Sequence, residues 1–276
     1  MSAAADRWRE RLAAWAIPDE LVAAAPESPY GFATDSFRRR GERAVSAEPT
    51  PTTRRALEAL PEGGSVLDVG VGGGGTSLPL ARRAGSVVGF DPQPDMLEGF
   101  RENAAGIGLE VRTIVGTWPE DADRAPDADV VVAGHVCYNT PELAAFAAAL
   151  DRHARRRVVV ELTEHHPLAW MADLWMTFHA LARPDGPAAG DAEAVVREAG
   201  LDVSREDWTV AERHGTGGFP RREDAIHLVR RRLCLPADRD DEIARALGDR
   251  LRLIDGLWDV GPAERTLVTL WWDSGP

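Results

Sequence analysis

The most constraining feature of the chain is a short, mostly apolar run, residues 66–69, that leads into a turn made almost entirely of glycine, residues 70–75. The run predicts a buried strand, and the apolar residues 78–81 predict a helix directly after the turn. Because glycine lacks a Cβ atom, its backbone adopts positive φ readily and can approach a ligand closely. A strand, a glycine turn and a helix in this order predict a site for a nucleotide-like ligand.

A second apolar run, residues 87–90, ends at Asp91, which lies 16 residues beyond Gly75. An acid at the tip of the second strand is placed to bind the two hydroxyls of a ribose in doubly wound α/β folds. The spacing of Gly70, Gly72 and Gly75 also satisfies the dinucleotide pattern G-x-G-x-x-G. Spacing alone therefore leaves a nicotinamide cofactor open.

Asp68 favours a positively charged ligand over a dinucleotide. Its carboxylate stands at the end of the first predicted strand, close to the expected site. Near a pyrophosphate it would cost Coulomb energy in a partly dry pocket, whereas a sulfonium that carries an ammonium group is attracted to it.

The pattern D-x-G-x-G-x-G, followed by an acid at the end of the next strand, resembles the class I S-adenosylmethionine-dependent methyltransferases of small-molecule type. The resemblance covers about residues 55–165 and implies S-adenosyl-L-methionine as the cofactor. In that family the glycine turn holds the methionine part of the cofactor and the strand-end acid holds the ribose. The resemblance implies these roles for Asp68, Gly70, Gly72, Gly74 and Asp91.

Strands alternate with helices along most of the chain, which predicts a parallel sheet. The expected fold is a doubly wound, mostly parallel seven-stranded sheet with N-terminal helices and a helical insertion before the last strand. Strands are expected at 66–69, 87–90, 110–115, 130–133, 158–161, 202–210 and 266–272, and insertion helices at 221–233 and 240–254. We expect one domain over residues 1–276, divided into an N-terminal helical cap at 1–52, a cofactor-binding core at 53–214, the insertion at 215–262 and the last strand at 263–276.

Composition narrows the classes of partner and chemistry. The net charge of −13 disfavours binding to nucleic acid, which needs a basic surface. All 32 basic residues are arginine, so chemistry through a lysine Schiff base is excluded. No segment has the length of a membrane span and the N-terminus lacks the pattern of a secretory signal, so we expect a cytoplasmic protein. We also expect the protein to be a monomer or a homodimer. The two cysteines, Cys137 and Cys234, are expected to pack as buried thiols.

Ligands of open α/β sheets lie outside the carboxyl ends of the strands, so the residues after each strand are candidates for the site. Thr117 and Trp118 follow the third strand, where the resembled family often has an acid that contacts adenine. Thr117 could form a hydrogen bond and Trp118 could stack on the adenine, but packing of Trp118 in the core is an equal alternative. His135 and Tyr138 follow the fourth strand, where the resembled family positions groups between cofactor and acceptor, and His135 is our first candidate for a functional residue there, both for binding the cofactor and for catalysis.

The fifth strand runs into Glu164, His165 and His166. A general base with a pKa near neutrality would deprotonate a phenol, an amine or an acidic carbon before methyl transfer, and His166 or His135 would serve. In the alternative interpretation the two adjacent histidines cap the next helix, since many methyl transfers need only alignment. Adjacent side chains point apart and no third ligand is evident, so no metal site is predicted.

Aromatic residues in two segments predict contacts with the acceptor. Trp170 and Trp175 lie in a predicted helix, residues 168–181, that is apolar around much of its circumference and could line an acceptor pocket or simply pack in the core. Tyr30 and Phe32 belong to an N-terminal arm that could close over the bound ligands. Glu164 and Tyr138 complete the candidate acceptor site.

The sequence therefore predicts methyl transfer from S-adenosylmethionine to the oxygen, nitrogen or carbon of a small molecule, for example in secondary metabolism. A nucleobase acceptor is disfavoured, because no N-P-P-Y or D-P-P-Y stretch follows the fourth strand and Cys137 lacks an adjoining proline. A nicotinamide-dependent oxidoreductase and a cofactor-binding protein without catalysis are the alternatives. Among the arginine runs, which are usually solvated surfaces, the one at 38–40 is the most interesting candidate for an anion site.

Overall fold

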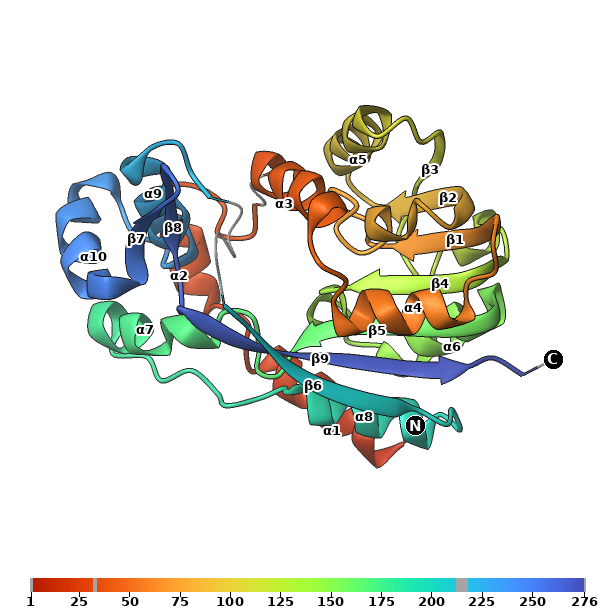
Figure 1. Cartoon of the computed structure of the whole chain (residues 1–276). Helices are drawn as coiled ribbons and strands as arrows, with labels where there is room; N and C mark the ends of the chain where they lie inside the picture. The colour runs from red at the N-terminus through yellow and green to blue at the C-terminus, as the bar shows by residue number, and fades with distance from the viewer. Residues whose placement is uncertain (1, 32–33, 212–217, 276) are drawn as a thin grey trace.

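A computed structural model of the chain describes residues 2–31, 34–211 and 218–275 and has a seven-stranded sheet at its centre (Figure 1). The strand order is β3-β2-β1-β4-β5-β9-β6, and all neighbours are parallel except β9, which runs antiparallel to both β5 and β6. The strands are β1 Gly64–Val69, β2 Ala84–Asp91, β3 Val111–Val115, β4 Ala128–Gly134, β5 Ala154–Thr163, β6 Ser204–Ala211 and β9 Glu264–Asp273. The predicted doubly wound, mostly parallel sheet is confirmed.

The apolar runs of the sequence form the centre of this sheet because both of its faces are covered. In β1, Leu67 packs into the hydrophobic cluster on one face and Val66 into the cluster on the other. In β4, Val131 and Val130 divide between the same two clusters. Side chains alternate between the faces of a strand, so a strand that is buried on both sides has a continuous apolar run.

Helices cover the two faces in separate layers (Figure 1). One layer consists of α1 Ala3–Ala13, α6 Leu143–His153 and α8 Ala189–Glu198, which contact one another. The other consists of α4 Pro51–Ala59 and α5 Pro94–Gly106, with α3 Thr34–Ser46 packed on α5. Local signals fix some helix starts, since Ser2 caps α1 and Thr50 caps α4, each accepting a backbone N–H bond.

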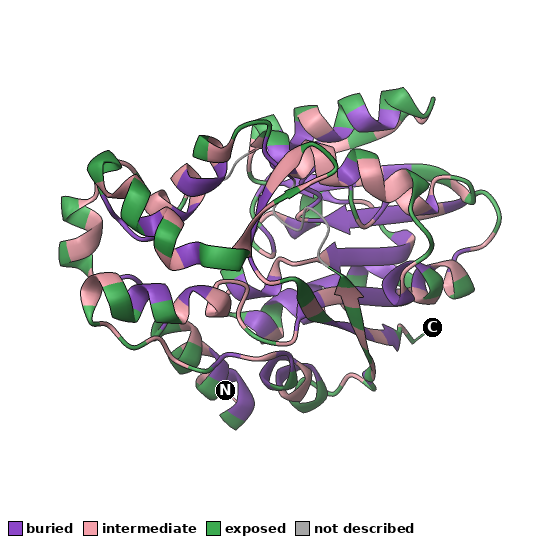
Figure 2. Ribbon diagram, turned by 60° about the vertical axis from the view of Figure 1, so that its left-hand side comes forward, coloured by how far each residue is buried: buried purple, intermediate pink, exposed green. Residues whose placement is uncertain are grey.

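A smaller lobe lies beside the carboxyl ends of the parallel strands, at the left of Figure 1. Its elements are α2 Asp19–Ala24, α7 Ala172–His179, α9 Arg222–Arg232, α10 Asp240–Leu247, β7 Leu251–Ile254 and β8 Leu257–Val260. They share a hydrophobic cluster of their own, which includes Leu174, Ile226 and Leu247. Figure 2 shows buried residues on the inner sides of these elements as well as in the sheet. The lobe is therefore packed around a second core.

Two local predictions were wrong, and one helix was missed. The predicted helix 240–254 ends at Leu247, and the chain continues into the β7–β8 hairpin, whose turn at Asp255 and Gly256 has positive φ at both residues. The helix predicted after the glycine turn is only the 3₁₀ turn η1 Leu78–Leu80. The N-terminal arm contains a 13-residue helix, α3, that the sequence did not predict.

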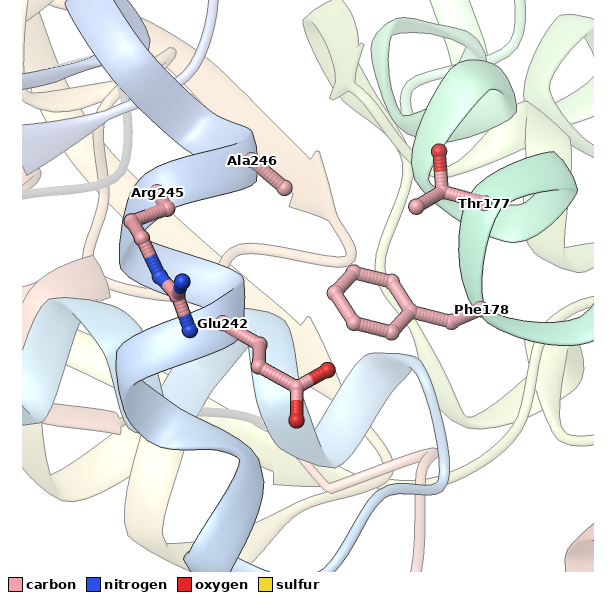
Figure 3. Close-up of a pocket in the computed structure, with 5 residues that line it drawn as sticks. All are labelled: Thr177, Phe178, Glu242, Arg245 and Ala246. Atoms are coloured by element: carbon pink, nitrogen blue, oxygen red, sulfur yellow. The ribbon is translucent and has the colours of Figure 1, made fainter.

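Figure 3 shows a pocket of about 380 Å³ within the small lobe. Phe178 of α7 faces Glu242, Arg245 and Ala246 of α10 across it, and Thr177 completes the lining. None of these residues belongs to the glycine turn or to a strand end of the sheet. Within the described parts of the chain, no helix combines the length and apolar character that crossing a membrane requires.

Candidate functional site

The glycine turn adopts the backbone conformation that its sequence predicts. Gly70, Gly72 and Gly74 have φ values of +72°, +50° and +84°. At Gly70 an added Cβ atom would lie 2.1 Å from Cγ1 of Val136, so the turn passes directly against the segment after β4. Only glycine tolerates both this φ and this close approach. The turn thus places its backbone at the carboxyl ends of β1 and β4.

Asp91 connects the end of β2 to the glycine turn. Its Oδ2 accepts the N–H of Gly72 at 3.1 Å, and its Oδ1 accepts the N–H of Gln93 at 2.9 Å. The side chain is buried; burial raises its pKa, and these two hydrogen bonds partly offset the rise. Each carboxylate oxygen has a second lone pair, so Asp91 keeps the capacity to accept two further hydrogen bonds, as a pair of ribose hydroxyls would require.

Asp68 is a fully buried carboxylate at the end of β1, and neither of its oxygens has a hydrogen-bond partner among the described residues. Ser77 lies beside it and Asp91 is near enough to act on it electrostatically. Burial, with a smaller contribution from Asp91, raises the pKa of Asp68 to about 7, and the hydroxyl and backbone N–H of Ser77, which lie near the carboxylate without meeting hydrogen-bond geometry, counteract the rise. A buried carboxylate without a partner is costly in the absence of a cation. The residues present therefore fit a ligand that brings a positive charge to the glycine turn.

This assignment predicts how the stability of the ligand-free protein depends on pH. Because the folded-state pKa of Asp68 lies above its ordinary value, the folded state favours the protonated form, and this stabilisation is lost as the pH rises towards and through about 7. We expect Asp68→Asn to stabilise the ligand-free protein by roughly 1–4 kcal/mol at pH 8 and by much less at pH 4, measured by urea denaturation. The same variant should bind S-adenosylhomocysteine more weakly. Asp95→Asn, at an exposed position, is the control; an equal gain at both pH values for Asp68→Asn would contradict the assignment.

Helix α3 covers the glycine turn, a contact that the sequence did not reveal. A Cβ atom at Gly41 would lie 1.8 Å from the carbonyl oxygen of Gly73, so the helix backbone and the turn are in direct contact. Asn103 of α5 joins them, because its Nδ2 donates to the carbonyls of Arg38 at 2.8 Å and Gly73 at 2.9 Å. Phe37 lies against Gly72. The N-terminal arm is therefore part of the wall around the site.

His135 lies at the carboxyl end of β4 and pairs with Glu161 of β5. Its φ of +60° is unusual for a residue other than glycine, and its N–H donates to the carbonyl of Glu161 at 2.7 Å. Its Nε2 lies 2.9 Å from Oε1 of Glu161. Donation from Nε2 leaves the lone pair on Nδ1 in the neutral imidazole. The pair has the arrangement of a general base that a carboxylate orients.

A chain of hydroxyl groups holds Glu161 in turn. The hydroxyl of Thr52, at the start of α4, donates to Oε2 of Glu161 at 2.5 Å and lies 2.8 Å from the hydroxyl of Thr269. The indole N–H of Trp208 donates to Thr269 at 3.1 Å. The pKa of Glu161 is lowered although burial opposes this, first by the hydrogen bond from His135 and then by Thr52 and the charge of Arg40. Both carboxylate oxygens of Glu161 are thus engaged and its side chain is fixed.

Thr117 and Trp118, which were predicted to contact adenine, have different surroundings. Thr117 is exposed, and its N–H donates to Asp121. Trp118 is buried in the core, where its ring meets Phe90 edge-on, which is the packing role that the sequence left open. Val115 was missed by the sequence analysis. It pairs with Asp91 across β2 and β3, and 45% of its surface is exposed, so it offers an apolar contact beside Asp91.

His166, the second candidate base, belongs to an aromatic cluster. Its ring stacks on Trp15 with 3.8 Å between centroids and meets Tyr138 edge-on. Burial, with a smaller contribution from the charge of Arg183, lowers the pKa of His166 to about 3. Its Nδ1 also accepts the N–H of Leu168 at 3.3 Å. The lowered pKa makes the ring of His166 a weak base. His135, whose ring is oriented by Glu161, is therefore the better candidate for a general base.

The residues predicted to bind the acceptor do not form one cluster in the structure. The hydroxyl of Tyr138 is buried and donates to the carbonyl of Thr163, while Glu164 pairs with Arg205 at 2.6 Å. Trp175 is buried in the core of the small lobe and Trp170 packs against the same cluster. Tyr30 is 53% exposed, and Phe32 lies outside the described residues.

Comparison with known proteins agrees with this geometry. A family model for a methyltransferase domain matches residues 66–157. The chain is 29% identical over 157 residues to a ubiquinone biosynthesis O-methyltransferase of Paramagnetospirillum magneticum, covering 51% of this chain and 61% of that protein. It is 37% identical over 92 residues to a protein of the same name from Azorhizobium caulinodans, covering 33% of this chain and 36% of that protein. The chain thus spans less than two thirds of the length of either relative.

Solved structures show the same fold at low sequence identity. A putative methyltransferase from Bacillus halodurans has a TM-score of 0.52 and 16% identity, with 82% of this chain and 99% of that chain covered. Magnesium protoporphyrin IX methyltransferase from Synechocystis, solved with bound S-adenosylhomocysteine (SAH), has a TM-score of 0.50 and 15% identity, with 91% and 92% covered. The Rossmann-like sheet of these proteins is the sheet described above.

Proposed function

We propose that the chain, which contains a methyltransferase domain over residues 66–157, is a class I S-adenosylmethionine-dependent methyltransferase that transfers a methyl group from this cofactor to a small molecule. The bound cofactor would supply an electrophilic methyl group on a positively charged sulfur. Among the described residues, the carboxylate of Asp68 beside the glycine turn is buried and has no hydrogen-bond partner, and this observation carries the proposal. A cationic cofactor satisfies this group, whereas the phosphates of a nicotinamide dinucleotide would repel it.

The residues proposed to hold the cofactor line the carboxyl ends of β1, β2 and β3. Asp68 faces the positive charge of the methionine part, and the backbone of the glycine turn contacts that part. Asp91 accepts the two ribose hydroxyls, a role supported by its free acceptor capacity. Val115 contacts the adenine, with Thr117 at its edge. These positions follow from the strand order, which brings the three strand ends together.

We assign activation of the acceptor to His135. In its neutral form Nδ1 removes a proton from the acceptor atom while Glu161 holds the ring through Nε2 and stabilises the imidazolium that results. The curated relatives are named O-methyltransferases, which supports a hydroxyl group as the acceptor. We assign a packing role to His166, whose ring contacts Trp15 and Tyr138. A small-molecule acceptor suits a site of this kind, while the monomeric or homodimeric state and the cytoplasmic location stay predictions from the sequence.

The test is calorimetric titration of the full chain with SAH, with reduced nicotinamide adenine dinucleotide as the paired ligand. We expect micromolar binding of the thioether and none of the nicotinamide. Binding of the nicotinamide alone would establish an oxidoreductase instead, a reading that the spacing of Gly70, Gly72 and Gly75 permits. Binding of SAH without turnover on any hydroxyl, amine or carbon acceptor would indicate a cofactor-binding protein that lacks catalysis.

A further inference from the structure

Three arginines of α3 lie on one side of the helix: Arg39, Arg40 and Arg43, which we call the arginine cluster. Arg43 is four positions from Arg39 and three from Arg40, and both spacings place side chains as neighbours on the surface of an α-helix. Two other positions, Phe37 and Gly41, contact the glycine turn. The arginine cluster therefore occupies a side of α3 next to the one that covers the cofactor site.

The arginine cluster faces the small lobe. Nη2 of Arg39 donates to the carbonyl of Gly218 at 2.7 Å. Burial lowers the pKa of Arg43, and the charges of Arg39 and Arg40 lower it further. Glu42 and, to a smaller extent, Asp259 of β8 act on the pKa of Arg43 in the opposite sense, and the carboxylate of Asp259 also pairs with Arg252 at 2.9 Å. The three guanidinium groups are thus close enough to act on one another, and their residues are partly buried.

The arginine cluster also reaches the candidate base. The positive charge of Arg40 acts on Glu161, the partner of His135, together with the stronger effects of His135 and Thr52. In Figure 1, α3 lies between the strand ends of the sheet and the small lobe. The helix that carries the arginine cluster and the strand end that carries His135 also border the same glycine turn, since Gly41 meets Gly73 and Val136, the residue after His135, meets Gly70.

The charge of the cluster contrasts with that of the chain, which carries 45 acidic and 32 basic residues. Guanidinium groups bind carboxylates and phosphates through paired hydrogen bonds. Each arginine of the cluster also has contacts within the chain, so a ligand would join groups that are already held.

We propose that the arginine cluster binds a carboxylate or phosphate group of the methyl acceptor, which makes the acceptor an anionic small molecule. This inference rests on the proposed function and adds the substrate class to it. The cluster fixes the anionic end of the acceptor and His135 meets the atom to be methylated. The distance between these two groups then selects acceptors by length as well as by charge.

The proposal is tested by titrating the full chain with inorganic phosphate and with benzoate, and following the shift in melting temperature at constant ionic strength. Benzamide, which has the shape of benzoate without its charge, is the paired neutral probe. We expect phosphate and benzoate to bind and benzamide not to bind. In Arg40→Gln and Arg43→Gln the affinity for both anions should fall about 10-fold or more.

Arg38→Gln is the matched control, because it removes the same charge from the same helix at a side chain that instead pairs with Glu42 and Glu102. Equal stabilisation of the wild-type protein by benzoate and benzamide would overturn the proposal, as would absence of phosphate binding or equal affinities in the control and the two cluster variants. Each titration is run with and without SAH. If the wild-type protein binds the anions but not SAH, only the cofactor assignment is contradicted.

Discussion

Replacement of Asp91 by alanine should reduce the affinity for SAH by about 100-fold or more. The carboxylate is expected to accept both ribose hydroxyls, and hydrogen bonds to a charged acceptor are the stronger ones. Asp91 also accepts the N–H of Gly72, so the variant loses an anchor of the glycine turn as well as a ligand. The measurement is calorimetric titration of the purified variant with SAH, after its fold has been checked by circular dichroism.

Asp95→Ala is the matched control for this prediction, because it removes a carboxylate four residues away at an exposed position in the first turn of α5. Its SAH affinity should equal that of the wild-type protein. Asp91→Asn separates the two roles of the residue, since its amide oxygen can still accept from Gly72 but its amino group cannot accept from a ribose hydroxyl. Wild-type affinity in Asp91→Ala would show that the ribose binds elsewhere.

Most of the fold could be predicted because its signals are local. The strands buried on both faces have apolar runs of the right length, and the glycine turn and Asp91 mark the strand ends that form the site. The hairpin of β7 and β8 was missed because Leu251 and Ile254 continue the helical spacing of Ile243 and Leu247. The dipeptide Asp255-Gly256, a strong signal for a hairpin turn, would have revealed it.

The sequence predicted where several residues of the candidate site lie, but not which side chains contact one another. His135 and the end of the fifth strand, where Glu161 lies, were expected at the same edge of the sheet, because the carboxyl ends of parallel strands meet there. Their contact depends on β4 and β5 being neighbours, which the sequence did not establish. Thr52 reaches Glu161 across 109 residues of sequence, so no local pattern contains it. Tertiary packing also decides the burial of Trp118.

The difference between the two candidate bases is likewise an effect of packing. Both are histidines at strand ends, and their sequence neighbourhoods favour neither. In the structure a carboxylate holds Nε2 of His135, whereas His166 is stacked on Trp15 and burial lowers its pKa to about 3. Histidine is an effective base near neutral pH only where its protonated form is tolerated. At His135 the carboxylate of Glu161 holds Nε2 at 2.9 Å and orients the ring.

We therefore expect His135→Ala to lower kcat by about 10² to 10⁴-fold while SAH affinity is unchanged. Turnover would be followed as SAH release with an acceptor found by screening hydroxylated carboxylates. Added imidazole should restore part of the activity of His135→Ala, a response that damage to the fold would not give. His166→Ala should slow turnover less and without rescue by imidazole, while Glu161→Gln should lower kcat about 10-fold because the ring loses its charged partner. Unchanged turnover in both histidine variants would remove the base from the mechanism and leave alignment of the acceptor with the methyl group as the source of catalysis.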